Sequence, residues 1–264
     1  MYFCQTIQNL IMTPFFSKQF EVGSHLIDKK FDIRLPYLLG YMQEVAEQHS
    51  ADQHVAWEDL QKKNTFWTLY RMGLQFEQFP HWHDTIDITT WANTPDHLIQ
   101  PRCFEIQNQR QQVIVKAYSL WTILDTINFK PQIVSDIVGD IIPCSDKGKD
   151  LFEKNLKIPK VSISDASPIC TREVLYSDID TNNHVNNTRY VGWLLDSYAL
   201  DFLETHHLKT IIINYTSQAH LGDYYEIYTQ IKDCNTHFST IIDRKTNEEF
   251  CKIKTIWTGI SQPR

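Results

Sequence analysis

The chain has 264 residues and a formal net charge of −7, and hydrophobic residues make up 42% of it. A chain of this size and composition can bury a sizeable core, as one large domain or as two small ones. The acidic balance argues against generic nucleic-acid binding, which uses a basic surface, so we expect no nucleic-acid partner.

The cysteines and the N-terminal residues indicate the cellular compartment in which the protein is expected. The six cysteines show no CxxC pair and no zinc-type spacing, so we expect free thiols in a reducing cytoplasm and no metal site. Met1 to Met12 contains neither a basic region nor a long apolar run, which fits neither a signal peptide nor a membrane helix. We therefore expect a cytoplasmic protein without membrane insertion, with translation starting at either Met1 or Met12.

The first half of the chain predicts a strand region, a helix and a series of strands. Phe15 to Ile33 is the strand region. The spacing i, i+3, i+4, i+7, i+11 predicts one apolar face of a helix, formed by Leu35, Leu38, Leu39, Met42 and Ala46. Runs rich in β-branched and aromatic residues predict strands at Thr65 to Phe76, Thr85 to Ala92, Cys103 to Asn108 and Val113 to Leu124.

The second half repeats this order. A short strand is expected at Glu173 to Tyr176, and helical spacing recurs at Val191, Leu194, Leu195, Tyr198, Ala199 and Phe202. Strand-like runs return at Thr210 to Thr216, Tyr224 to Ile231, Phe238 to Asp243 and Cys251 to Ile260. Two landmarks of the first half recur in the second half at nearly the same distance along the chain: Asp84 matches Asp223, and Trp121 matches Trp257. The sequence therefore predicts an internal duplication of a strand–helix–multistrand unit.

A proline-containing, irregular stretch from Lys130 to Pro168 separates the halves, with a short helix expected near Asp150 to Leu156. We therefore predict an N-terminal unit over residues 1–130, a linker over 131–169 and a C-terminal unit over 170–264.

A polar motif precedes the second predicted helix. Asp180, Asn182 and His184 occupy every second position, which places their side chains on one side of an extended segment. The helix expected from Asn187 to Leu203 adds unpaired N–H groups and the positive end of its dipole. Such a site can hold a carbonyl oxygen, position a water and move a proton, which indicates acyl-group chemistry. Taken singly, the same residues are also typical of turns, helix caps and buried histidines.

The motif from Asp180 to Asn187, continued by Tyr190 and Trp193, resembles the active-site motif of acyl-acyl-carrier-protein (acyl-ACP) thioesterases, the plant plastid enzymes and their bacterial relatives. The first half contributes weaker matches in the same order, Trp67-Thr-Leu-Tyr-Arg71-Met, Trp82-His-Asp84-Thr-Ile with Thr90-Trp91, and Ser119-Leu-Trp121.

The resemblance implies an α+β tandem hotdog fold, in which each half is a long helix wrapped by a curved antiparallel sheet. The first half would shape the acyl pocket and the second would carry catalysis. The implied catalytic residues are Asp180, Asn182 and His184. Hydrolysis would release a free fatty acid from its carrier protein and end chain elongation.

The sequence departs from the family pattern at one place. Gln218 stands where the family has a glutamate, and Ala219 stands where the plant enzymes have a cysteine. Gln218 can hydrogen-bond a water but cannot take a proton, so we assign it a supporting polar role. This departure puts in doubt any mechanism that needs a cysteine nucleophile or a glutamate base there.

The resemblance further implies an apolar acyl pocket and an acidic carrier protein as partner. We expect Leu38, Met42, Trp67 and Leu69 to line the pocket. Carrier docking would use a local basic patch despite the net negative charge, with Lys29, Lys30, Lys62, Lys63 and Lys130 as candidates. A homodimer is left open.

The expected mechanism is direct attack by water, with Asp180 or His184 as general base and no metal or organic cofactor. Helix N–H groups and the Asn182 amide would stabilise the carbonyl oxygen. Two other functions remain open, an acyl-CoA thioesterase and a non-catalytic acyl-binding module.

Overall fold

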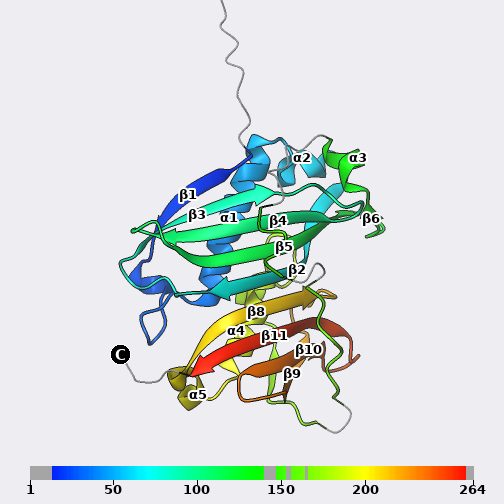
Figure 1. Cartoon of the computed structure of the whole chain (residues 1–264). Coiled ribbons are helices and arrows are strands. Elements are labelled where there is room, and N and C mark those ends of the chain that lie inside the picture. The colour runs from blue at the N-terminus through cyan, green and yellow to red at the C-terminus, as the bar shows by residue number, and fades with distance from the viewer. Residues whose placement is uncertain (1–13, 140–146, 153–155, 164–165, 260–264) are drawn as a thin grey trace, which may run out of the picture.

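The computed structural model describes residues 14–139, 147–152, 156–163 and 166–259. In this part of the chain 11 strands form one antiparallel sheet (Figure 1). The strands of the first half are β1 (Phe16–Glu21), β2 (Thr65–Phe76), β3 (Thr85–Ala92), β4 (Gln100–Asn108), β5 (Val113–Asp125) and the short β6 (Pro131–Gln132). Those of the second half are β7 (Cys170–Glu173), β8 (His206–Tyr215), β9 (Tyr224–Ile231), β10 (Thr236–Asp243) and β11 (Glu249–Gly259).

The strand order shows the duplication. Apart from β6, which pairs with β5, the order is β1-β3-β4-β5-β2-β8-β11-β10-β9-β7, so the second half repeats the first in reverse. The halves join where β2 pairs with β8. The Trp121 Nε1–H donates to Ser119 Oγ at 2.9 Å, and the Trp257 Nε1–H donates to Thr255 Oγ1 at 2.8 Å. These matching contacts confirm the predicted internal repeat.

Two helices face each other on the same side of this sheet. They are α1 (Leu35–Asp52) and α4 (Asn187–Asp196), which pack together and share one hydrophobic core with the sheet (Figure 1). The predicted apolar stripe of α1 is buried, since Leu38 and Met42 are 0% exposed. The other helices of the described residues are the 3₁₀ segments at Ser24–Leu26 and Tyr176–Asp178 and the short α2 (Trp57–Gln61), α3 (Val134–Val138) and α5 (Leu200–Thr205). No helix in the described ranges is long and apolar enough to span a membrane.

The helix predicted from Asn187 to Leu203 is wrong in its length. It breaks after Asp196, and α5 follows as a separate helix. At the break the Ser197 hydroxyl donates to the Leu194 carbonyl at 2.6 Å, a local bond that competes with helix continuation. Tyr198 then turns toward the sheet, where its hydroxyl lies 3.1 Å from His237 Nδ1.

The strand predictions err at the starts of both halves. The region Phe15 to Ile33 holds β1 and a 3₁₀ turn in place of a continuous strand, and the strand expected at Glu173 to Tyr176 ends at Glu173. The pattern of polar and apolar residues did not reveal these turns.

The linker is more ordered than its composition predicts. It contains β6 and α3, and its described later part packs on the face of the sheet opposite α1, where Leu156 joins a second cluster with Trp91, Tyr118 and Leu120. The helix expected near Asp150 to Leu156 falls partly outside the described residues, and residues 150–152 form a turn and bend.

Asn214 fastens this linker to β8. Its Nδ2 group donates to the Leu156 carbonyl at 2.7 Å, and its Oδ1 accepts from the Ile158 N–H at 3.0 Å. Because Asn214 is 4% exposed, Asn214→Ala leaves buried backbone groups without partners. We expect the free energy of unfolding to fall by about 1–3 kcal/mol, measured by urea denaturation.

The control is Asn235→Ala, which removes the same amide from an exposed turn and is expected to change stability little. Equal stabilities of the two variants would contradict a fastening role for Asn214.

Candidate active site

The motif before α4 folds into a tight loop. The Asp180 N–H donates to the His184 carbonyl at 2.8 Å, and the Asn183 N–H donates to the Asp180 carbonyl at 3.0 Å. Asp180 Oδ1 accepts from the Asn182 N–H at 2.8 Å. Asn183 has φ 64°, in the left-handed region that asparagine tolerates. The extended segment assumed from the alternation is therefore wrong.

Neighbouring elements hold this loop in place. The Val185 N–H donates to the Ala219 carbonyl at 2.9 Å, which ties the loop to the segment after β8. The Asn186 side chain accepts from the Thr188 N–H at 3.0 Å and caps α4. The loop's side chains are thereby presented from a fixed backbone next to a helix N-terminus.

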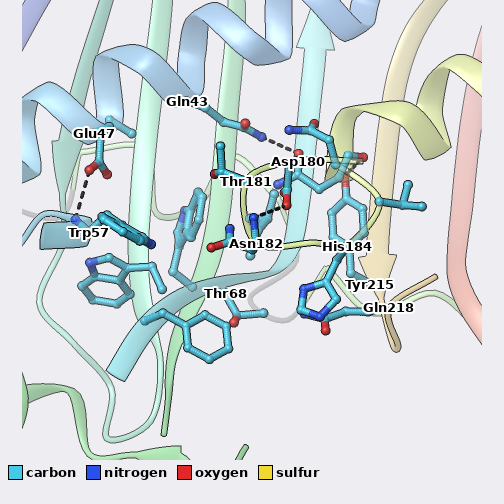
Figure 2. Close-up of a pocket in the computed structure, with 18 of the residues that line it drawn as sticks. Gln43, Glu47, Trp57, Thr68, Asp180, Thr181, Asn182, His184, Tyr215 and Gln218 are labelled. Atoms are coloured by element: carbon cyan, nitrogen blue, oxygen red, sulfur yellow. Dashed lines mark hydrogen bonds between the residues drawn. The ribbon is translucent and has the colours of Figure 1, made fainter. Parts of the chain in front are cut away.

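Both halves contribute walls to one cavity of about 370 Å³ beside this loop (Figure 2). The loop contributes Asp180, Asn182 and His184, and the segment after β8 contributes Gln218. The first half contributes side chains from α1, α2, β2, β4 and β5, among them Gln43, Glu47, Trp57, Trp67, Leu69, Arg102 and Trp121. The four residues singled out for chemistry thus face one space, together with Trp67 and Leu69.

Leu38 and Met42 do not line this cavity. Both are fully buried in the core between α1 and the sheet. The cavity meets α1 on a neighbouring face at Gln43 and further along the helix at Ala46 and Glu47. The helical spacing identified the buried face correctly but did not show which part of the helix borders the cavity.

Several contacts of the lining residues were not predicted from the sequence, although Asn187 and Tyr190 belong to the motif. Gln43 lies on the polar face of α1, yet its side chain donates to Asn187 Oδ1 at the start of α4. The Tyr215 hydroxyl donates to the Asn187 carbonyl at 3.1 Å, and the Tyr190 hydroxyl accepts from the Ala219 N–H at 3.0 Å. These contacts depend on how α1, α4 and β8 meet in space, so no local pattern could have identified them.

His184 lies beside a second imidazole. The rings of His184 and His220 meet edge to face, with centroids 5.1 Å apart, and His220 Nδ1 lies 3.8 Å from Asp223 Oδ2. Partial burial lowers the pKa of His184 below its ordinary 6.5, and the neighbouring His220 lowers it further. His184 is therefore neutral at pH 7 and able to accept a proton.

The first half repeats the loop with other side chains. Asp28 Oδ1 accepts from the Lys30 N–H at 2.7 Å, and the Asp28 N–H donates to the Asp32 carbonyl at 2.8 Å. Lys30 and Asp32 thus stand where the second half has Asn182 and His184. This first-half loop borders a separate cavity and lacks the amide and the imidazole.

The candidate docking lysines do not form one patch. Lys29 contacts Glu204, and Lys30 Nζ donates to the carbonyls of Leu203 and His206, so both lie against α5. Lys62 and Lys63 follow α2, which lies at the opposite end of the molecule from α5 in Figure 1.

Chemically, the site combines a carboxylate, a neutral imidazole, two amides and a helix N-terminus around a cavity with an apolar wall. In the first turn of α4 the N–H groups of Thr188 and Arg189 donate to Asn186, which leaves the Asn187 N–H to stabilise a developing oxyanion. Among the described residues there is no cluster of three metal-ligating side chains.

Comparisons with known proteins identify the family. The profile of the acyl-ACP thioesterase N-terminal domain matches residues 14–142, and that of the C-terminal domain matches residues 164–259. The chain is 26% identical over 231 residues to a chloroplastic palmitoyl-acyl carrier protein thioesterase of Gossypium hirsutum, covering 84% of this chain and 56% of that protein. It is 28% identical over 223 residues to oleoyl-acyl carrier protein thioesterase 2 of Arabidopsis thaliana, covering 79% and 59%.

The chain therefore spans just over half the length of these plant relatives. An acyl-ACP thioesterase structure from Bacteroides thetaiotaomicron superposes with a TM-score of 0.81 at 22% identity, covering 93% of this chain and 98% of that one. This likeness confirms the tandem hotdog fold. With both domain profiles matched in order across most of its length, the chain belongs to the acyl-ACP thioesterase family.

Proposed function

We propose that this protein hydrolyses the thioester of fatty acyl-ACP to a free fatty acid and the carrier protein, and so ends fatty acid elongation. One observation carries the proposal. The side chains of Asp180, Asn182 and His184 share one cavity with the apolar side chains of Trp67 and Leu69. A thioester carbonyl held at the loop would place its acyl chain along the apolar wall.

In the proposed mechanism a water attacks the carbonyl carbon directly. Asp180 positions the water and His184, neutral at pH 7, takes its proton, while Gln218 hydrogen-bonds the water from the neighbouring segment after β8. Asn182 and the Asn187 N–H at the start of α4 stabilise the oxyanion. The thiolate leaves with little acid assistance because the pKa of a thiol is low. Ala219 has no nucleophilic side chain, so no covalent intermediate forms there.

The proposed organisation assigns the acyl pocket to residues 1–130, a linker to 131–169 and catalysis to 170–264. The cavity walls support this division, since most of the apolar lining side chains come from the first unit and the loop comes from the last. We propose a cytoplasmic location because Cys103, Cys170, Cys234 and Cys251 are free thiols, as expected in a reducing compartment. A homodimer stays a prediction, to be decided by the molar mass in solution.

The test is thiol release from a panel of acyl-ACP thioesters, with the matching acyl-CoAs alongside. Faster release from the carrier-bound form is expected. A preference for the CoA form would indicate an acyl-CoA thioesterase. Tight acyl binding without turnover at stoichiometric protein would indicate a binding module.

Gln218→Glu tests the supporting role of the amide. A carboxylate at this position accepts hydrogen bonds but cannot donate one at neutral pH. If Gln218 donates a hydrogen bond to the water or to a neighbouring side chain, the variant loses activity, and we expect a fall in kcat of about 10-fold. Initial rates on one acyl-ACP substrate measure it. The control is Gln78→Glu in the corresponding segment of the first half, where Phe79 occupies the position equivalent to Gln218. A rise in kcat would instead show that a carboxylate works better there.

A further inference from the structure

A buried arginine lies in the wall of the acyl cavity. Arg102, on β4, is 6% exposed. Its Nη1 group donates to His49 Nδ1 at 3.0 Å and to Thr90 Oγ1 at 3.3 Å, and its Nη2 group donates to Ser50 Oγ at 3.2 Å. All three acceptors are uncharged side chains. A plain hydrocarbon pocket has no need of such a cation, since burying a guanidinium without a carboxylate is costly.

Arg102 nevertheless keeps its charge. Burial lowers the pKa of its guanidinium to about 10, while the nearby Glu47 acts in the opposite direction. At neutral pH the group is therefore a cation. Glu47 makes no direct contact with it: the Glu47 carboxylate accepts from the Trp57 N–H at 3.0 Å, and the hydrogen bonds of the guanidinium go to uncharged side chains.

A second polar side chain of the same wall has an unused acceptor. Gln100 is 3% exposed and lies two residues before Arg102 on β4. Its Nε2 group donates to the carbonyls of Asn93 at 2.6 Å and Pro101 at 3.0 Å, which fixes the orientation of the amide. Its Oε1 is buried and has no hydrogen-bond partner, and the same holds for the Thr68 hydroxyl, which Figure 2 shows in this pocket. Buried polar atoms without partners are uncommon in folded proteins.

The duplicated fold does not itself require this arginine. By strand register Arg102 pairs with Ser119, and the equivalent pair in the second half is His237 with Thr255. There the imidazole of His237 is satisfied by the hydroxyl of Tyr198. The second half thus fills the equivalent position with a neutral side chain that bonds inside the protein. The cation belongs to the half that forms the acyl cavity.

We propose that Arg102 and Gln100 select acyl groups that carry an oxygen substituent, a hydroxyl or a carbonyl, over unsubstituted chains of the same length. This inference rests on the proposed function and narrows its substrate class. A substituent oxygen accepts a hydrogen bond from the guanidinium, and a hydroxyl also donates to Gln100 Oε1. A hydrocarbon chain against the same wall removes water from both groups and returns no hydrogen bond.

The test compares carrier thioesters in matched pairs of equal chain length, unsubstituted against hydroxy- or oxo-substituted, with the substituent stepped along the chain. For at least one position we expect kcat/KM of the wild-type protein to favour the substituted chain about 10-fold or more. Arg102→Met keeps most of the side-chain volume and removes the charge, so the ratio should fall to near one. The exposed Arg110→Met is the charge-matched control and should keep the wild-type ratio.

Gln100→Leu provides a second variant should Arg102→Met fold poorly, and it should lower the preference for hydroxylated chains most. Preference for unsubstituted chains at every position would overturn the inference, and so would an unchanged ratio in a folded Arg102→Met protein. Binding of hydroxy and unsubstituted fatty acids by calorimetry separates the two proposals. Absence of turnover with a retained binding preference would refute the hydrolase function alone.

Discussion

Asp180→Asn is expected to lower kcat for acyl-ACP hydrolysis by about 100- to 10,000-fold, with little change in stability. The asparagine carbonyl oxygen can still accept from the Asn182 N–H, so the loop keeps its shape. What the variant loses is the negative charge that positions and polarises the attacking water. Single-turnover rates at saturating protein measure the chemical step, and thermal unfolding checks that the loop is intact.

The duplicated loop supplies a matched control. Asp28→Asn makes the same change at the equivalent position, where Asp28 Oδ1 accepts from the Lys30 N–H. If Asp180 serves only as a turn residue, the two variants should behave alike. If Asp180→Asn and Asp28→Asn both keep a kcat close to that of the wild type, Asp180 does not take part in the chemistry.

His184→Ala is expected to lower kcat by about 100-fold or more, because the variant lacks the general base. Added imidazole should restore part of the rate, since it can enter the space that the side chain leaves. A purely structural role would show no such rescue. His81→Ala, at the first-half position equivalent to His220 and in contact with Asp32, is the control and should keep wild-type kcat. Full activity of folded His184→Ala would contradict its assignment as base.

The pH dependence of kcat/KM tests the same assignment. Because the pKa of His184 lies below 6.5, the imidazole stays neutral down to pH values under 6.5, and activity should fall only as it gains a proton below that point. His220→Ala removes a neighbour that lowers this pKa, so the acid limb should shift to higher pH. An acid limb that moves to lower pH, or does not move, would exclude this coupling.

Local sequence pattern was sufficient for most of the sheet. The strand Thr65–Phe76 was predicted at both ends, because its β-branched and aromatic residues stop at a turn on either side. The end of the second helix was missed, because apolar spacing continues through Tyr198 while the backbone breaks at a hydroxyl–carbonyl bond of Ser197.

The candidate site was predictable where its residues are close in sequence. Asp180, Asn182 and His184 do face one space, although a left-handed Asn183 brings them there rather than an extended backbone. Gln43 and Arg102 could not be found in this way. Gln43 lies outside the apolar stripe predicted for the helix, and Arg102 lies just before the strand predicted from Cys103; only the placement of α1 and β4 around the cavity brings them into the site.

The pairing of β2 with β8 bears on how the protein behaves at low concentration. The cavity needs walls from both halves, and in a protein made of two separate chains its assembly would weaken on dilution. Here one covalent chain carries both, so their association is intramolecular and has a fixed effective concentration. The specific activity of each molecule should accordingly stay constant at the lowest concentrations a cell contains.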